Sequence, residues 1–294
     1  MYRYALIVGC LFLTALFTRA ALSGDSGPCD EPRIKFLDDL VGVHRRDPFE
    51  ERIETERHDF TQSTKTVGYH VAQIEAGYSY FYNDNAQEIE RSHTSPELML
   101  RVGLSDDIEF RIRWDYAWRF VDEADNRDGA EDLRWGIKLG ITDQECLVPE
   151  SALEIRFTVP TGGTAWSTDR VEFGLDYIYQ WEVATGWDLY GSTGFGTGAL
   201  DDFGFVPEDP TTDRFLVWSQ SLALGVELTE RATMYAEWYG IFSRGLDEEK
   251  LTHTFNMGID YYVTDDFVVD FRAGVGLNDD TDDLFTGIGG GYRF

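Results

Sequence analysis

Positive charge is scarce in this chain, and that shortage excludes a large class of partners. Lysine and arginine number 25 against 54 aspartate and glutamate residues, which leaves a net charge of −29. Because nucleic-acid binding needs a basic surface, we expect no nucleic-acid partner. Strongly acidic chains with few aromatic residues are often disordered, but here 15% of the residues are aromatic. The chain therefore has apolar surface to bury and is expected to fold.

Long apolar runs are also missing beyond the N-terminus, so the sequence predicts no transmembrane helix. The one long run, Tyr4–Phe17, lies within MYRYALIVGCLFLTALFTRAA and is too short to span a bilayer as a helix. A basic residue precedes the run and small residues follow it, as in a secretory signal peptide. We therefore predict a signal peptide over residues 1–21 and export to a periplasm, the exterior or an outer membrane.

From residue 71 onward, apolar and polar residues alternate, which indicates β-strands. The clearest run is IEFRIRWDYAWRF, residues 108–120, whose even positions are all apolar or aromatic. Strands of soluble proteins are mostly about 5–6 residues long, so this length disfavours a soluble β-sandwich. The pattern predicts twelve strands, at 71–82, 95–104, 108–120, 133–141, 152–159, 171–183, 187–198, 214–228, 232–243, 252–263, 267–277 and 284–294.

The connections between these strands differ in length. Five are short, at 105–107, 142–150, 184–186, 229–231 and 264–266, whereas most of the others, such as 83–94 and 121–132, are longer. Short turns at one end and long loops at the other are the layout of a transmembrane β-barrel. We therefore predict an all-β fold in which residues 67–294 form an antiparallel transmembrane β-barrel of about twelve strands, with its short turns in the periplasm.

The sequence stops within an alternating strand, GIGGGYRF. A sheet that spans a membrane must close, because lipid cannot satisfy an open edge. We therefore expect the last strand to pair with the first and Phe294 to lie at the lower membrane boundary. The inward-facing Gly287, Gly289 and Gly291 would make room inside a narrow barrel.

The residues that open the predicted barrel resemble a known family. The stretch ETERHDFTQSTKTVGYHVAQIEAGYSYFYN, residues 54–82, is similar to the start of the outer-membrane family named for the meta-pathway of phenol degradation, with His58 where that family usually has proline. Two later runs, LGVELTERATMYAEWYG and VTDDFVVDFRAGVGLNDDTDDLFTGIGGGYRF, are also similar, so the resemblance covers residues 54–294. It implies an outer-membrane barrel that acts as a transporter, with small aromatic compounds as its supposed substrates. Phe294 also resembles the C-terminal signal that the outer-membrane assembly machinery reads.

Charged residues on the inward face of the predicted strands fall into two groups. The basic group comprises Arg101, Arg111, Arg113, Arg119, Arg134, Lys138 and Arg156, and the acidic group comprises Glu172, Asp176, Glu182, Glu227, Glu237, Asp260 and Asp270. On opposite walls of a water-filled lumen, the two groups would create a transverse field that orients dipolar solutes. Alternatively, the charges pair across a narrow barrel and fill it, because buried charges must pair. The sequence leaves both alternatives open.

Residues 22–66 precede the predicted barrel and are expected either to lie in the periplasm or to plug the lumen. Within them, RIKFLDDLV at 33–41 has the pattern of a short amphipathic helix. Of the three cysteines, Cys10 leaves with the signal peptide, so Cys29 and Cys146 remain. An even pair can form a disulfide in an oxidising compartment. We therefore predict a Cys29–Cys146 disulfide that tethers the segment to the barrel.

The sequence contains no recognisable catalytic or metal-binding motif. Neither His93 nor His253 is accompanied by a serine motif, and the acidic loops lack the spacing of a calcium-binding loop. We therefore expect no enzyme, no metal site and no cofactor. The sequence favours an outer-membrane channel or transporter for small solutes, surrounded by outer-membrane lipid. The alternative is a non-conducting structural or adhesive barrel that acts through its acidic loops.

Overall fold

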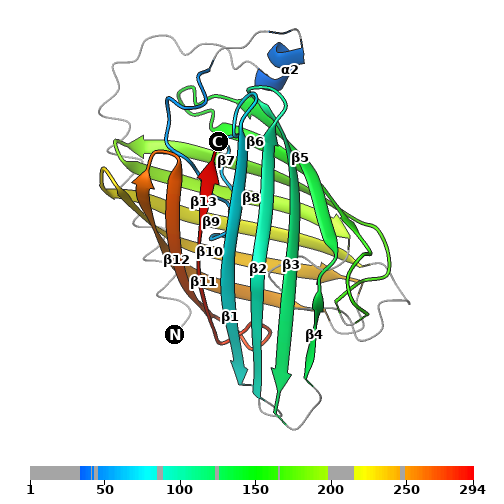
Figure 1. Cartoon of the computed structure of the whole chain (residues 1–294). Helices are drawn as coiled ribbons and strands as arrows, with labels where there is room; N and C mark the ends of the chain where they lie inside the picture. Colours follow the sequence, from blue (N-terminus) through cyan, green and yellow to red (C-terminus); the bar gives the residue numbers. More distant parts are fainter. Residues whose placement is uncertain are drawn as a thin grey trace.

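The computed structural model describes residues 34–40, 42, 46–84, 89–122, 126–164, 166–197, 215–245 and 249–294. Within these residues the chain forms one short helix and a sheet of thirteen strands (Figure 1). The elements are α2 (Lys35–Leu40), β1 (Ala72–Asp84), β2 (Ile89–Gly103), β3 (Ile108–Val121), β4 (Arg127–Ala130), β5 (Leu133–Thr142), β6 (Glu150–Val159), β7 (Glu172–Ala184), β8 (Trp187–Thr197), β9 (Leu216–Thr229), β10 (Ala232–Arg244), β11 (Leu251–Thr264), β12 (Phe267–Gly276) and β13 (Leu284–Arg293). The predicted signal peptide, residues 1–21, lies outside the described residues.

The sheet closes on itself as an antiparallel barrel. Each strand pairs with its neighbour in the sequence, except that β3 pairs with β5 along its first half and with the extra strand β4 along its second half. β1 then pairs with β13, and Ala72 and Phe294 exchange two backbone hydrogen bonds of 2.9 Å at this seam. Twelve strands of the described chain therefore form the wall, which confirms the predicted pairing of the last strand with the first.

Two of the predicted loops contain residues that form strands in the structure, so these predictions are partly wrong. Residues 89–94, placed in the loop 83–94, continue β2, where Arg91 pairs with Tyr82 and His93 with Tyr80. These polar residues stand on the outer face near the rim, among tyrosine rings, so the apolar alternation that marks a strand is lost there. The predicted loop 121–132 contains the short strand β4.

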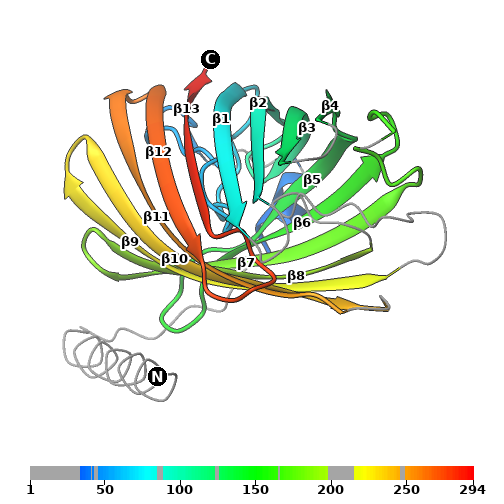
Figure 2. The ribbon, with the colours of Figure 1, turned by 90° about the horizontal axis from the view of Figure 1, so that it is seen from below.

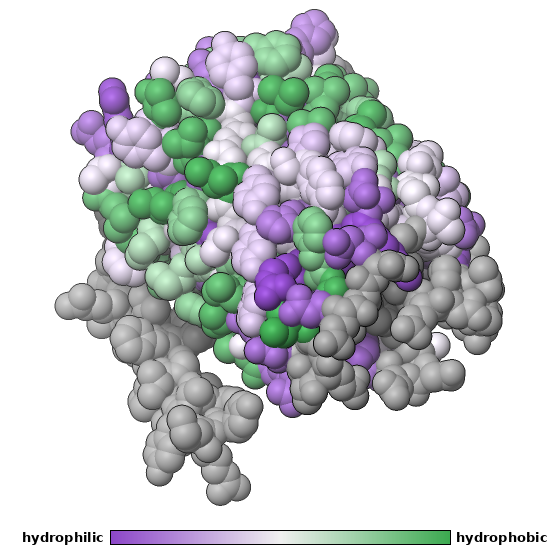
Figure 3. All heavy atoms as spheres, turned by 60° about the horizontal axis from the view of Figure 1, so that its bottom comes forward, coloured by the Kyte–Doolittle hydropathy of each residue, from purple (hydrophilic) through white to green (hydrophobic). Residues whose placement is uncertain are grey.

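The outer face of the barrel is apolar, whereas its inner face is polar. On β11, Met257 and Ile259 are 43% and 40% exposed, but the alternate residue Asn256 is 2% exposed. The apolar side chains gather over the outside of the strands (Figure 3). This is the reverse of a water-soluble protein, and an apolar belt of this kind is stable only in lipid. No helix among the described residues is long and apolar enough to cross a membrane.

The two ends of the barrel differ. The turns 104–107, 143–149, 185–186, 230–231 and 265–266 lie at one end, which we call the short-turn end. The loop 277–283 lies at the opposite end, which we call the long-loop end. Helix α2 docks at the short-turn end, where the Asp39 carboxylate accepts hydrogen bonds from Ser105 Oγ at 2.7 Å and from the Asp107 amide at 2.6 Å.

Residues 46–71, which we call the luminal segment, fold into the barrel from the short-turn end. The amide of Ile53 donates to the carbonyl of Asp265 at 2.7 Å where the segment enters, and the amide of Val67 donates to Glu109 at 2.9 Å where it returns towards β1. The view along the barrel shows this segment inside the ring of strands (Figure 2). Part of the inner surface of the barrel is therefore covered by residues 46–71.

Candidate functional site in the barrel lumen

Glu56 of the luminal segment binds the basic side of the lumen. Its carboxylate lies 3.0 Å from Arg101 Nη2 and 2.5 Å from Arg111 Nη2, and it contacts Lys138 Nζ. Lys138 is fully buried and Arg101 is 1% exposed. Buried charges are tolerated only when they are paired and hydrogen-bonded, so Glu56 is a structural counter-ion for three cations on β2, β3 and β5.

Arg57, the next residue, points to the adjacent part of the wall, over β1 and β13. Its guanidinium pairs with Glu97 of β2 at 2.5 Å and contacts the carboxylate of Asp270 on β12. A Cβ atom at Gly77 or at Gly289 would lie 2.4 Å from atoms of this guanidinium. These inward glycines therefore make room for Arg57 of the luminal segment.

His58 carries a further positive charge of the segment to the acidic side. Its Nε2 lies 3.3 Å from Asp260 Oδ2, and its carbonyl accepts a hydrogen bond of 2.8 Å from the Tyr235 hydroxyl. Burial lowers the pKa of His58, but the negative charges of Asp260 and Asp59 outweigh this effect and raise it to about 10. His58 is therefore an imidazolium at neutral pH.

The tip of the luminal segment is held by β9 and β10. The carboxylate of Glu237 accepts hydrogen bonds from the amides of Phe60 and Thr61, at 3.0 and 2.7 Å, and the Thr61 hydroxyl lies 2.5 Å from Ser221 Oγ. The Phe60 ring stacks on Tyr239 with ring centroids 4.3 Å apart. This ring joins an apolar cluster inside the lumen that comprises Phe215, Val217, Tyr239 and Ile241.

Every residue of the predicted basic group has an acidic partner. Besides the partners of Glu56, these are the pairs Arg113–Asp115 at 2.9 Å, Arg119–Glu90 at 2.6 Å, Arg156–Asp176 at 2.7 Å and Arg134 with Asp115. Most of these carboxylates lie on the same strands as the cations or on the adjacent ones. The basic group is therefore neutralised largely within its own wall and by Glu56.

The predicted acidic group is bound mainly by the luminal segment. Asp270 pairs with Arg57, Asp260 with His58 and Glu227 with Arg52. Glu237 accepts a hydrogen bond from the amide of Thr61. The other three residues are Glu172, which pairs with Arg170 at 3.2 Å, Asp176, which pairs with Arg156, and Glu182, which is exposed near the short-turn end.

The sequence analysis missed that the luminal segment lies between the two groups and matches each one. Glu56 faces the basic residues, whereas Arg57 and His58 face the acidic ones. The feature of the sequence that indicates this arrangement is the reversal of charge between positions 56 and 57, in a segment without strand periodicity. A segment that carries both signs of charge at adjacent positions is suited to bridging walls of opposite charge.

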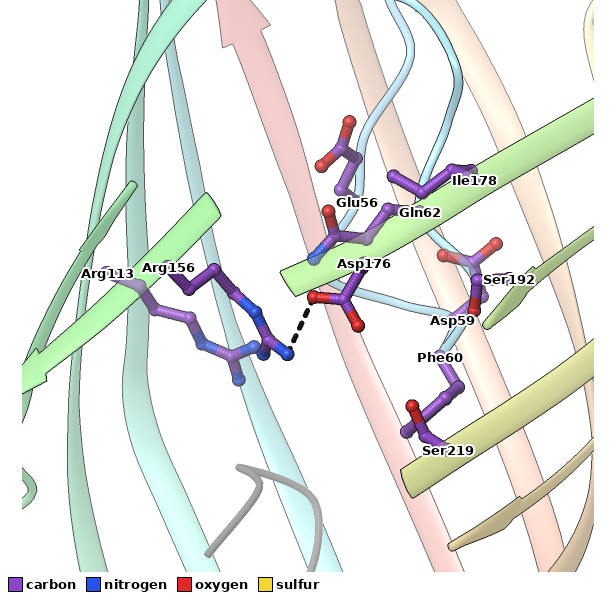
Figure 4. A pocket seen from close by; sticks show the side chains of 10 residues that line it. All are labelled: Glu56, Asp59, Phe60, Gln62, Arg113, Arg156, Asp176, Ile178, Ser192 and Ser219. Atoms are coloured by element: carbon purple, nitrogen blue, oxygen red, sulfur yellow. Dashed lines mark ion pairs between the residues drawn. The ribbon is translucent and has the colours of Figure 1, made fainter. Parts of the chain in front are cut away.

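Three cavities of the described barrel follow one another along the lumen, and two of them lie between the luminal segment and the wall. The middle one, of about 50 Å³, lies between Asp59 and Phe60 of the segment and Arg113, Arg156 and Asp176 of the wall (Figure 4). A second cavity, of about 40 Å³ towards the long-loop end, shares Arg113 with it and includes Trp166. A third, of about 130 Å³ towards the short-turn end, shares Asp59. Each is large enough for water, which needs about 10–15 Å³, and neighbouring cavities along the lumen share a lining residue.

The remaining sequence predictions concern cysteine and metals. Cys146 is disulfide-bonded, whereas the Cys29 half of the predicted pair lies outside the described residues. Among the residues that the structure describes, no group of three or more His, Cys, Asp or Glu could hold a metal ion.

Comparison with known proteins gives a family and a fold. A family model described as "Putative MetA-pathway of phenol degradation" matches residues 55–294. Among solved structures, an outer membrane channel from Pseudomonas putida F1 is similar with a TM-score of 0.57 and 12% identity, over 85% of this chain and 100% of that chain. The NanC porin has a TM-score of 0.46 and 9% identity, over 76% of this chain and 100% of that chain. No curated protein matches the chain in sequence. The closed barrel, its apolar belt and this shared fold place the chain in an outer membrane.

Proposed function

We propose that this chain, which belongs to the phenol-degradation family matched over residues 55–294, is an outer-membrane channel for small polar solutes whose lumen is narrowed by the luminal segment. The series of three cavities supports this function, because neighbouring cavities share a lining residue. Arg113 borders the middle cavity and the one towards the long-loop end, and Asp59 borders the middle cavity and the one towards the short-turn end. The lining is charged and hydroxyl-rich, as in pores that select polar solutes.

The middle of the proposed path lies beside the Arg156–Asp176 pair. Arg156 Nη2 is 2.7 Å from Asp176 Oδ2, and the two side chains face Asp59 and Phe60 across the middle cavity (Figure 4). A cavity of about 50 Å³ admits water or a small solute group, so larger solutes require the luminal segment to move. The family description adds small aromatic compounds to the candidate solutes.

A second function, a closed structural or adhesive barrel, is favoured by a different observation. Glu56, Arg57 and His58 satisfy the buried charges of both walls, and such saturation would suit a permanently filled lumen. The two functions differ in one testable property, because only the channel lets solutes through.

The test is a solute-uptake assay with the full chain reconstituted in liposomes. Swelling rates are measured with glycine, arabinose and hydroxybenzoate, for the wild type and for Asp59→Trp, which fills the junction between two cavities. A matched control is Asp279→Trp on the exposed 277–283 loop. The channel proposal expects uptake of the smallest solute by the wild type and by the control, with a large loss in Asp59→Trp. A folded barrel that excludes all solutes in every variant would support the structural function instead.

A further inference from the structure

The largest of the three cavities has the lining of a cation-binding site. It lies at the short-turn end between the luminal segment and β7–β11, and carboxylates of Glu54, Asp188, Glu227 and Asp260 border it together with the ring of Tyr262. Tyrosine faces and carboxylates together are the groups that bind organic cations in proteins. The cavity measures about 130 Å³, slightly less than a cavity of about 150 Å³ that holds benzene.

A cation of the chain itself already occupies one edge of this cavity. The guanidinium carbon of Arg52 lies 4.3 Å from the centroid of the Tyr262 ring, and its Nη2 contacts the carboxylate of Glu227. Arg52 is held by side-chain contacts near the mouth, where its side chain is 27% exposed and that of Glu227 is 47% exposed. The Arg52 guanidinium therefore marks a cation position that is reachable from the short-turn end.

One carboxylate oxygen in the cavity has unused capacity. Asp260 is 9% exposed, and its Oδ2 faces His58 Nε2 at 3.3 Å, but its Oδ1 is buried with no hydrogen-bond partner. A buried carboxylate oxygen without a donor is costly. A ligand that brings N–H donors into the cavity would supply the missing hydrogen bond.

We propose that this cavity binds a small organic cation of the guanidinium or ammonium type, which competes with the Arg52 side chain for the Tyr262 ring and for the neighbouring carboxylates. The ligand has about five heavy atoms, which matches the size of the cavity. The site lies on the inner surface of the barrel and exists whether or not the lumen conducts. Binding displaces Arg52 and so loosens the start of the luminal segment.

The test is isothermal titration calorimetry of the refolded full chain in detergent micelles with methylguanidinium chloride at constant ionic strength. Arg52→Ala removes the internal competitor and is expected to bind about tenfold more tightly than the wild type. Tyr262→Leu, which loses the aromatic face, is expected to bind about tenfold more weakly, whereas Tyr262→Phe keeps the wild-type affinity. Urea, the neutral analogue, is expected not to bind.

A matched control separates this site from other arginine–tyrosine contacts. Arg91 also lies over a tyrosine ring, 5.9 Å from the centroid of Tyr82, but on β2 far from the cavity. Arg91→Ala is therefore expected to leave the affinity unchanged. Heat-modifiable migration on gels verifies that each variant is a folded barrel. Folded Arg52→Ala protein without saturable binding, or with an affinity no higher than that of the wild type, overturns the proposal.

Discussion

Glu237 on β10 accepts hydrogen bonds from both the backbone amide and the hydroxyl of Thr61, at 2.7 and 2.5 Å. The same carboxylate accepts the Phe60 amide at 3.0 Å and the Asn256 side chain at 2.8 Å. One wall residue therefore anchors the tip of the luminal segment. The stability of that anchor determines how often the segment leaves the lumen.

The first prediction concerns this anchor. Glu237→Gln keeps the shape of the side chain but removes the charge that strengthens its hydrogen bonds, each worth about 1.5–3 kcal/mol. Release of the luminal segment should rise about tenfold or more, and trypsin should then cleave after Arg57 correspondingly faster in the folded barrel. The control is Asp279→Asn in an exposed loop. Equal cleavage rates in both variants would show that Glu237 does not hold the segment.

The second prediction tests the contact between Gly77 and Arg57. Gly77→Ala places a Cβ atom 2.4 Å from the guanidinium carbon of Arg57, which pushes Arg57 away from Glu97 and Asp270. Leaving buried charges unpaired costs about 3 kcal/mol or more, so the midpoint of urea unfolding should fall clearly. Gly163→Ala, whose added Cβ has only a 3.8 Å contact, is the control.

A double variant separates this effect from a general loss of stability. In an Arg57→Ala background the space beside Gly77 is empty, so Gly77→Ala should have no further effect on unfolding. Additive losses from the two substitutions would contradict the steric account.

The third prediction concerns pH at the long-loop end, where Glu131 and Asp282 border the same cavity. Burial and the nearby Asp115 raise the pKa of Glu131 to about 7, and burial and the nearby Glu90 raise that of Asp282 to about 7. Because these pKa values are raised, both groups lose their negative charge as the pH falls through 7. Their neutral forms favour the folded barrel, and that stabilisation is lost as the pH rises through 7.

The preference of the pore for cations over anions should therefore decrease when the pH is lowered from 8 to 5.5. Reversal potentials in a potassium chloride gradient measure it. The Glu131→Gln, Asp282→Asn double variant should show, at both pH 8 and pH 5.5, the weak cation preference that the wild type has at pH 5.5. A wild-type preference that does not change with pH would mean that solutes do not pass this cavity.

The fourth prediction is that the disulfide of Cys146 is formed with Cys29. Mass spectrometry of a non-reduced tryptic digest should find the two peptides linked, and reduction should separate them. Cys146→Ser should leave a free thiol at Cys29. A dimer linked through Cys146, visible on non-reducing gels, would contradict the pairing within one chain.

The wall of the barrel could be predicted from the sequence because its pattern is local. Alternation such as that of 108–120 repeats every two residues, and the closure of β13 on β1 follows from the need to satisfy every backbone group in lipid. The prediction failed at 89–94, where the strand enters a polar rim and Arg91 and His93 replace apolar residues. Periodicity carries no information once both faces are polar.

The contents of the lumen could not be predicted in the same way. The luminal segment has no regular pattern, and its contacts join residues far apart in the chain, such as Arg57 and Asp270. Strand periodicity predicts which charges face inward, but the partners of residues such as Asp260 and Asp270 depend on how the segment folds back. Only the three-dimensional structure shows that Glu56 faces one group and Arg57 the other.

The most direct measurement of the central claim is single-channel conductance of the full chain in planar bilayers, compared between the wild type and Glu237→Gln. If the luminal segment narrows a continuous path, the wild type should show small, discrete openings. Glu237→Gln should show larger or more frequent ones, because the segment is released from Thr61 and Phe60. If both proteins are folded barrels and neither conducts, the cavities do not form a path and the lumen is closed.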